Sequence, residues 1–417
     1  TLYNNTTGSY NISIGQESMH DNTTGSNNVA VGYEALRASS IGQFNTAVGY
    51  RALYSSTTAS YNSAFGYETL YNNTTGQYNI AIGFRTLKAN TTGQYNVGIG
   101  FESLLENTGG QANVALGYAA SKENTTATNN VAIGFSALRE TTTGSSNVAV
   151  GYEALRISVT GYNNVAIGNS ALRNNISGHS NVAIGKDSLL NNTTASYNIA
   201  MGYKTLETNT TGQYHVAIGY EALTDNTVGT NNVGMGYRAL YLNTTGAKNV
   251  AIGFEAHRGN TTGVNNVSVG YQANYGATTG INNVAIGNET NRYNVGGRDN
   301  IFVGHLAGRG TNGSYVGDYN IGIGTQSSYV MTTGSNNVAI GGFTLFANTT
   351  GASNVAVGYQ AVKSNTTGVN NIGIGLEALK DNTIGRDNVA MGTFALANNT
   401  TGNYNVGIGY QALEDNT

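Results

Sequence analysis

The chain has 417 residues, including 58 glycines and 28 tyrosines but no cysteine, proline or tryptophan, and a formal charge of −3. Without cysteine there is neither a disulfide framework nor a thiolate metal site. The absence of a basic stripe excludes nucleic-acid binding, which needs several phosphate contacts from Lys or Arg. No apolar run approaches the ~20 residues of a membrane helix, so we expect no membrane span. Only 10% of the residues are charged, which favours a repeat array over an ordinary soluble enzyme.

A glycine recurs along the chain with a period of 17 residues. It runs without a slip from Gly15 to Gly304, takes one step of 20 to Gly324, and continues in steps of 17 to Gly409. These anchor glycines define 24 units with one three-residue insertion. Self-similarity at a fixed period is the signature of stacked supersecondary units. We therefore predict an all-β fold, a parallel β-solenoid or β-roll of 24 coils, in which each coil has two short strands and two turns.

The regularity of the repeat divides the chain into three predicted regions. Residues 1–303 are regular repeats, although their core weakens from about residue 254. An irregular unit with the insertion follows at 304–324, and regular repeats resume at 325–417. Both ends of the sequence fall inside a unit, so we expect the array to be longer than the residues given.

The residues before each anchor glycine predict the packed strand. Four positions before the anchor stands an asparagine in every unit except one, where His215 replaces it. Two Val/Ile positions follow, which we call the aliphatic columns, and a small residue between them, usually Ala or Gly, forms the small column. We expect the aliphatic columns and the later leucines to form the core, the asparagines to pair from coil to coil, and the small column to leave a flat outer strip for self-association. The predicted ladders are represented by Asn79, Asn96, Gly83, Gly100, Ile82 and Ile99.

The residues after each anchor glycine add an aromatic column, a charged column and a leucine column. An aromatic residue such as Tyr33 usually comes first, then a variable position, then Ala, Ser or Thr, then usually Leu. The variable position carries charges that alternate in sign from coil to coil, so neighbouring coils face each other with opposite charges. Each exposed pair is worth about 0.2–1 kcal/mol, which indicates register control rather than catalysis. This salt ladder is represented by Glu34, Arg51, Glu68, Arg85 and Glu102.

The loop of each unit closes with N-T-T-G, which is good turn chemistry because Asn and Gly tolerate positive φ. In thirteen units its asparagine also begins an N-x-S/T sequence, so an exposed turn here would be an acceptor for N-linked glycans. The asparagines therefore serve either as turn residues only or also as glycan acceptors, and the sequence does not decide between the two. No cofactor is expected, so a covalent glycan would be the one non-protein group on the chain. The candidate asparagines are Asn5, Asn22, Asn73, Asn90, Asn124, Asn175, Asn192, Asn209, Asn243, Asn260, Asn348, Asn365 and Asn399.

The motif N-V-A-I-G-Y-E-A-L, nearly complete at 147–155 and again at 215–223, resembles the head repeat of YadA-like trimeric autotransporter adhesins. Related repeats occur in phage tail-fibre proteins. The resemblance covers essentially all units, although the family's usual unit is shorter and the extra length here falls in the N-T-T-G loop. It implies a left-handed β-roll, a trimer of chains side by side, and binding to host or matrix surfaces.

The stretch 254–330 is the one place where a unique site could lie. The leucine column fails there in five consecutive units, and unrepeated charged residues gather nearby. A weakened stretch of core is favoured over an enzyme site, and no metal site is expected because the five histidines fall in five different columns. The failed positions are His257, Asn274, Asn291, Gly308 and Ser328, and the gathered residues are Arg292, Arg298, Asp299, His305, Arg309 and Asp318.

These patterns predict an extracellular structural fibre or filament without enzymatic activity, which displays repeated N-T-T turns. Its main partner would be itself, side by side or end to end. The alternative is an adhesin head or shaft that binds a host or environmental surface. An ice-binding solenoid and a polysaccharide-active enzyme are less favoured, the first because adjacent threonines in a turn point their side chains apart.

Overall fold

The computed structural model describes residues 1–311 and 315–416. Among these residues every regular element is a β-strand, and no helix is present that could cross a membrane. The predicted all-β solenoid with a 17-residue repeat is confirmed. The chain divides into two compact units, Thr1–Thr211 and Gly212–Thr417, and each carries twelve of the 24 strands found in the described residues.

In the first unit the strands are β1 (Ile12–Ile14), β2 (Val29–Val31), β3 (Thr46–Val48), β4 (Ser63–Tyr67), β5 (Ile80–Phe84), β6 (Val97–Phe101), β7 (Val114–Leu116), β8 (Val131–Ile133), β9 (Val148–Val150), β10 (Val165–Ile167), β11 (Val182–Ile184) and β12 (Ile199–Met201). In the second unit they are β13 (Val216–Ile218), β14 (Val233–Met235), β15 (Val250–Ile252), β16 (Val267–Val269), β17 (Val284–Ile286), β18 (Ile301–Val303), β19 (Ile321–Ile323), β20 (Val338–Ile340), β21 (Val355–Val357), β22 (Ile372–Ile374), β23 (Val389–Met391) and β24 (Val406–Ile408).

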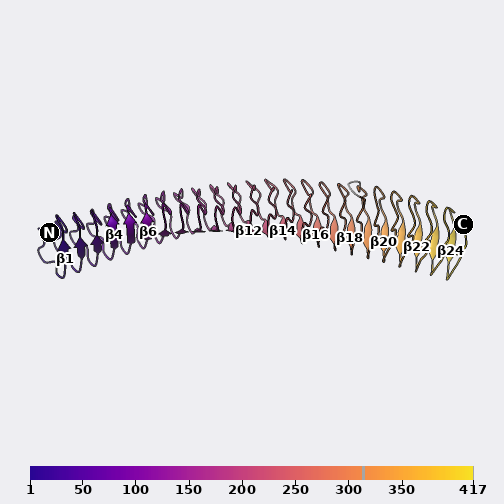
Figure 1. Ribbon diagram of the computed structural model, residues 1–417, viewed down its shortest axis with the longest axis horizontal. Coiled ribbons are helices and arrows are strands. Elements are labelled where there is room, and N and C mark those ends of the chain that lie inside the picture. Colours follow the sequence, from indigo (N-terminus) through magenta and orange to yellow (C-terminus); the bar gives the residue numbers. More distant parts are fainter. Residues whose placement is uncertain (312–314, 417) are drawn as a thin grey trace. The chain divides into compact units, whose positions relative to one another are not determined.

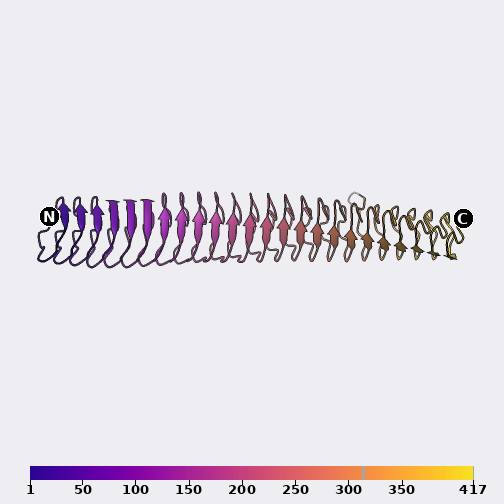
Figure 2. The ribbon, with the colours of Figure 1, turned by 90° about the horizontal axis from the view of Figure 1, so that it is seen from below.

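Within each unit every strand pairs in parallel with the strand of the next coil, and equivalent residues lie opposite each other. Val148 pairs with Val165, for example, which is the register set by the 17-residue period. The insertion shifts one pairing, so that Ile301 of β18 faces Ile321 of β19. In Figure 1 one strand, β5, lies between the labelled strands β4 and β6, and Figure 2 shows the arrows of the first unit pointing in one direction.

Each coil has one strand, not the two that the sequence predicts. The segment after the anchor glycine alternates left-handed residues with right-handed or extended ones, as at Glu34 (φ 52°) and Leu36 (φ 51°). Its backbone still bonds to both neighbouring coils: Glu34 N–H donates to Gln16 O (2.9 Å) and Leu36 N–H to Ala52 O (3.0 Å). A left-handed conformation is unfavourable for a residue with a side chain, so these inter-coil hydrogen bonds help to hold it.

The face of the strand that the sequence predicts to be buried is exposed in the structure, and the face predicted to be exposed is buried. Ala81 in the small column is fully buried, whereas Ile80 and Ile82 of the aliphatic columns are 41% and 38% exposed. The reason is the narrow interior of a 17-residue coil. At Gly98 in the small column, even one added Cβ would meet Thr86 Cγ2 at 2.6 Å. Larger side chains of the strand therefore point outward, and the core consists of small residues, the leucine column and asparagines.

The anchor glycines are required by conformation and by space. Gly83 and Gly100 have φ of 134° and 130°, a region that L side chains rarely adopt. A Cβ at Gly83 would also collide with the carbonyl oxygen of Gly100 in the next coil. The positive φ recurs at the other anchors, which accounts for the period read from the sequence.

The ladder asparagines form a buried hydrogen-bond array between coils. Asn96 donates to Asn79 Oδ1 through its backbone N–H (3.0 Å) and through its Nδ2 (3.1 Å). Asn79 Nδ2 in turn donates to Gly93 O (2.9 Å). His215 stands in one coil of this column, where its Nε2 lies 2.7 Å from Gly229 O and its Nδ1 accepts from the backbone N–H of Asn232 (3.2 Å).

The core around the insertion is rebuilt rather than simply weakened. Gly308 replaces a core leucine, but Phe302 in the small column of the same unit turns its ring into that space, so that a Cβ at Gly308 would collide with it. Phe302, Ala307, Tyr315 and Met331 form their own buried cluster. The expected loss of core is therefore offset at this coil. Part of the predicted irregular unit, 312–314, lies outside the described residues.

Candidate functional site

An outward apolar face runs along the strands of each unit. It consists of the two aliphatic columns and the aromatic column, which alternate outward in the longer strands, as at Ile80, Ile82 and Phe84 of β5. We call these three columns the apolar face. In the first unit its aromatic rings stack from coil to coil with centroids 4.9–5.3 Å apart, through Tyr33, Tyr50, Tyr67, Phe84, Phe101, Tyr118, Phe135 and Tyr152.

The apolar face is almost free of charge. In the first unit Lys186 is the one charged residue in its three columns. Monomeric proteins rarely expose a contiguous apolar patch of more than a few hundred Å², and larger patches mark interaction sites. With Ile80, Ile82 and Phe101 about 40% exposed, a coil with an aromatic residue in this column presents on the order of 200 Å² of outward apolar surface. Sequence reasoning missed this face because it assigned the aliphatic columns to the interior.

The predicted salt ladder lies at the edge of the apolar face and links neighbouring coils. Arg51 Nε lies 2.6 Å from Glu34 Oε2, and Arg85 Nε lies 3.1 Å from Glu68 Oε2. Glu102 instead contacts the ammonium of Lys122 at 2.8 Å, from a different column. Burial alone would raise the pKa of Glu68, but hydrogen bonds from Lys88 and Arg85 outweigh it and lower that pKa.

The sequence predicts that the turn asparagines are exposed, but the structure buries them. All thirteen glycosylation candidates except Asn5 are fully buried. Asn90 Nδ2 donates to Asn73 Oδ1 (2.7 Å) and to Gly93 O (3.1 Å), so these amides form a second ladder inside the coil. Of the two threonines that follow Asn73, Thr74 donates to Thr91 O of the next coil (3.1 Å) and Thr75 is exposed.

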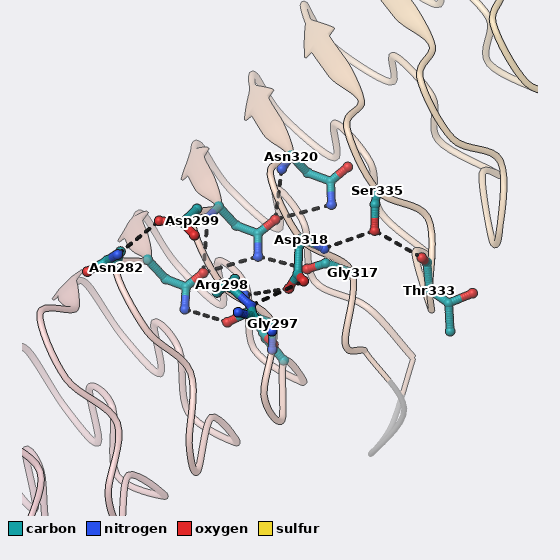
Figure 3. Close-up of polar contacts among 12 residues, drawn as sticks. Asn282, Gly297, Arg298, Asp299, Gly317, Asp318, Asn320, Thr333 and Ser335 are labelled. Atoms are coloured by element: carbon teal, nitrogen blue, oxygen red, sulfur yellow. Dashed lines mark hydrogen bonds and ion pairs between the residues drawn. The ribbon is translucent and has the colours of Figure 1, made fainter.

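The charged residues near the insertion pair with neighbouring coils and do not converge on one point. Asp299 accepts from Asn282 Nδ2 (2.9 Å), and Asp318 accepts from the backbone N–H of Arg298 (2.8 Å), as Figure 3 shows. Asp318 also accepts with Oδ2 from the Arg298 guanidinium (3.3 Å).

In the described residues, none of the remaining candidates of this cluster forms an ion pair with Asp299 or Asp318. Arg292 and Arg309 both contact Glu289, at 2.6 and 3.2 Å, and His305 is exposed on the aromatic column. Residues 1–311 and 315–416 enclose no pocket. The same residues hold no group of three His, Asp or Glu side chains able to bind a metal ion. The described arrangement therefore brings no reactive constellation together.

His257 in the leucine column is the histidine whose pKa is shifted furthest. It is fully buried, and within the described part of the chain neither ring nitrogen has a hydrogen-bond partner. Burial lowers its pKa to about 3. His215 in the asparagine ladder is also buried, and burial lowers its pKa to about 4 despite its backbone hydrogen bonds.

Acid is therefore expected to destabilise the second unit. An unfolded histidine takes up a proton as the pH falls through about 6.5, while His257 stays neutral in the folded state. Its contribution to stability is present above that pH and is lost as the pH falls toward the folded pKa, by about 2 kcal/mol at about pH 5. We expect His257→Leu, which restores the repeat residue, to reduce the loss of urea resistance between about pH 7 and 5. The exposed His305→Asn serves as control; an equal effect of both variants would contradict the expectation.

Comparison of the sequence with models of known protein families and with curated proteins gives no match. The resemblance to YadA-like head repeats therefore stays a prediction carried by the repeat motif.

Proposed function

We propose that the chain is an extracellular structural protein that builds a fibre by side-by-side association of its solenoid through the apolar face. The observation that carries the proposal is the outward direction of both aliphatic columns and the aromatic column. A stable interface takes about 800 Å² from each partner, which about four or five coils of this face would supply. Many coils in each unit repeat the same surface, so association would scale with the length of the array.

A second copy of the same chain is the partner that fits this face best. The exposed rings recur every 4.9–5.3 Å along the first unit, and only a partner with the same period can match such a surface coil by coil. A side chain from one copy can then pack into the gap between two side chains of the other, as in interfaces between paired sheets. The lack of charge means that few ions need to be desolvated on association.

The proposal is tested by placing charges on the face. The triple variant Ile82→Lys, Ile99→Lys and Ile133→Lys should dissociate toward the 43.4 kDa monomer at a higher protein concentration than the unchanged chain, because lysines buried in these coils would oppose association there. The matched control carries lysines at Thr75, Thr92 and Thr126, which are exposed on the turn, and should assemble like the unchanged chain. Circular dichroism would establish that all three proteins are folded. An unchanged chain that sediments as the monomer would overturn the proposal.

An adhesin is the second candidate function. It is favoured by a further exposed aromatic series outside the apolar face, Phe44, Tyr61, Tyr78 and Tyr95, which association through that face need not cover. A glycan coat has less support than the sequence suggested, because the acceptor amides lie inside the coil. Exposed threonines such as Thr75 remain as O-linked acceptors. Intact mass of the native material would distinguish bare from modified chains.

A further inference from the structure

Three tyrosines form an exposed stack on the turn that precedes the strand. The ring centroids of Tyr61 and Tyr78 are 4.9 Å apart with an interplanar angle of 6°, and those of Tyr78 and Tyr95 are 5.1 Å apart at 2°. The side chains are 47%, 43% and 55% exposed. We call these residues the tyrosine stack. Each ring faces a second phenol at close range while its edge stays open to solvent.

The backbone fixes this arrangement in every folded molecule. All three residues have left-handed backbones, with φ of 60°, 58° and 60°, so their side chains leave the coil in the same direction. Tyr78 N–H donates to Ser60 O (3.3 Å) and Tyr95 N–H to Gln77 O (3.1 Å) of the preceding coil. The spacing of the rings is therefore the spacing of the coils, not a chance contact between mobile side chains.

We propose that the tyrosine stack is a site of oxidative cross-linking, at which a haem peroxidase with hydrogen peroxide joins neighbouring coils through dityrosine. The oxidised enzyme removes one electron and one proton from each of two phenols, and the peroxide is reduced to two waters. The two phenoxyl radicals form a carbon–carbon bond between ring carbons next to the hydroxyl. The two hydrogens on those carbons then move to the oxygens, so the product has lost two hydrogen atoms in all.

Proximity selects the partner in this reaction. A radical on Tyr78 has a phenol about one coil away on each side, whereas a phenol on another molecule must arrive by diffusion. Exposure of the rings lets them rotate about their side-chain bonds from the stacked geometry to the bonding geometry. On one side the series ends at Phe44, 5.0 Å from Tyr61, and phenylalanine forms no phenoxyl radical. Within the tyrosine stack the expected products are thus the Tyr61–Tyr78 and Tyr78–Tyr95 links.

Tyr319 provides a matched comparison within the same column. It is 55% exposed, as Tyr95 is, but the equivalent residues in the adjacent coils are Asp299 and Asn336. Exposure alone would make Tyr95 and Tyr319 equally reactive toward coupling. Tyr95 has a stacked phenol and Tyr319 has none in the adjacent coils of its column, so we expect Tyr95 to couple more readily.

The test is treatment of the full chain with horseradish-type peroxidase and hydrogen peroxide, followed by peptide mapping. We expect dityrosine fluorescence and linked peptides that join tyrosines of the stack within one chain. Tyr78→Phe keeps a stacked ring and should abolish both links, whereas Tyr319→Phe should abolish neither. The lysine triple variant of the apolar face should give the same links as the unchanged chain, since the proposal does not rest on self-association. No dityrosine in the stack, or coupling of Tyr319 as frequent as that of Tyr95, would overturn it.

Discussion

Replacement of Asn79 by alanine is expected to lower the free energy of unfolding around its coil by about 3 kcal/mol. The change removes the hydrogen bond from Asn79 Nδ2 to Gly93 O and leaves the backbone N–H of Asn96 without its acceptor. Gly93 O keeps its bond from Asn90 Nδ2, and Asn96 Nδ2 keeps its bond to Gly110 O. Each buried polar group left without a partner costs about 1–3 kcal/mol. Because contacts in a solenoid reach only adjacent coils, the loss should stay local. Hydrogen exchange of the amides at 79–97 measures it directly.

Asn72 supplies the control for this prediction. It has the same side chain but is exposed on the turn of the preceding coil, so Asn72→Ala should change the same amides by no more than about 0.5 kcal/mol. If the two variants exchanged at equal rates, the asparagine ladder would have no energetic role.

Replacement of Phe302 by alanine is expected to cost about 4 kcal/mol near the insertion. Phe302 is fully buried, packs edge to face on Tyr315 with centroids 6.2 Å apart, and fills the space left by Gly308. Its removal opens a cavity that the neighbouring backbone cannot close, and such changes cost about 3–5 kcal/mol. The difference is measured by urea unfolding followed through hydrogen exchange of β18 and β19.

The double variant Phe302→Ala and Gly308→Leu tests the reason for that cost. It restores the repeat pattern in this unit, and Gly308 already has the left-handed φ (58°) that leucines adopt elsewhere in the column. We expect most of the lost stability to return. Phe135→Ala removes an exposed ring of the apolar face and should cost about 1 kcal/mol or less in the dispersed chain. If the double variant were no more stable than Phe302→Ala alone, the idea that the Phe302 ring replaces the missing leucine at position 308 would be refuted.

The period, the strand positions and the parallel stacking were predictable from the sequence, because the anchor glycines and the alternation of Val and Ile express them directly. Which face of the strand points into the core was not predictable. Alternation at Ile80, Ala81 and Ile82 defines two faces without saying which is inside. Interior volume decides it, since a closed coil of this length holds alanines but not isoleucines on the strand.

The rest of the coil was less predictable for a different reason. Leu36 and Glu34 adopt positive φ although nothing in their side chains favours it, so the sequence carries no signal that this segment is not a second strand. The turn asparagines carried a readable signal, because a buried ladder requires asparagine at one fixed position in successive coils. The pairing of Phe302 with Gly308 was also readable, since both exceptions fall in one unit.

The apolar face as a surface covered by a second copy is tested most directly by thiol labelling, because the chain contains no cysteine. Single variants Ile82→Cys, Thr75→Cys and Ala81→Cys place one thiol on the face, on the exposed turn and in the core. At neutral pH we predict rapid labelling at Thr75→Cys and labelling of Ala81→Cys only after unfolding. Ile82→Cys should label slowly in the assembled chain and faster when Ile99→Lys and Ile133→Lys in nearby coils weaken the association there. Equal, rapid labelling of Ile82→Cys and Thr75→Cys in the otherwise unchanged chain would show an open face and contradict association through it.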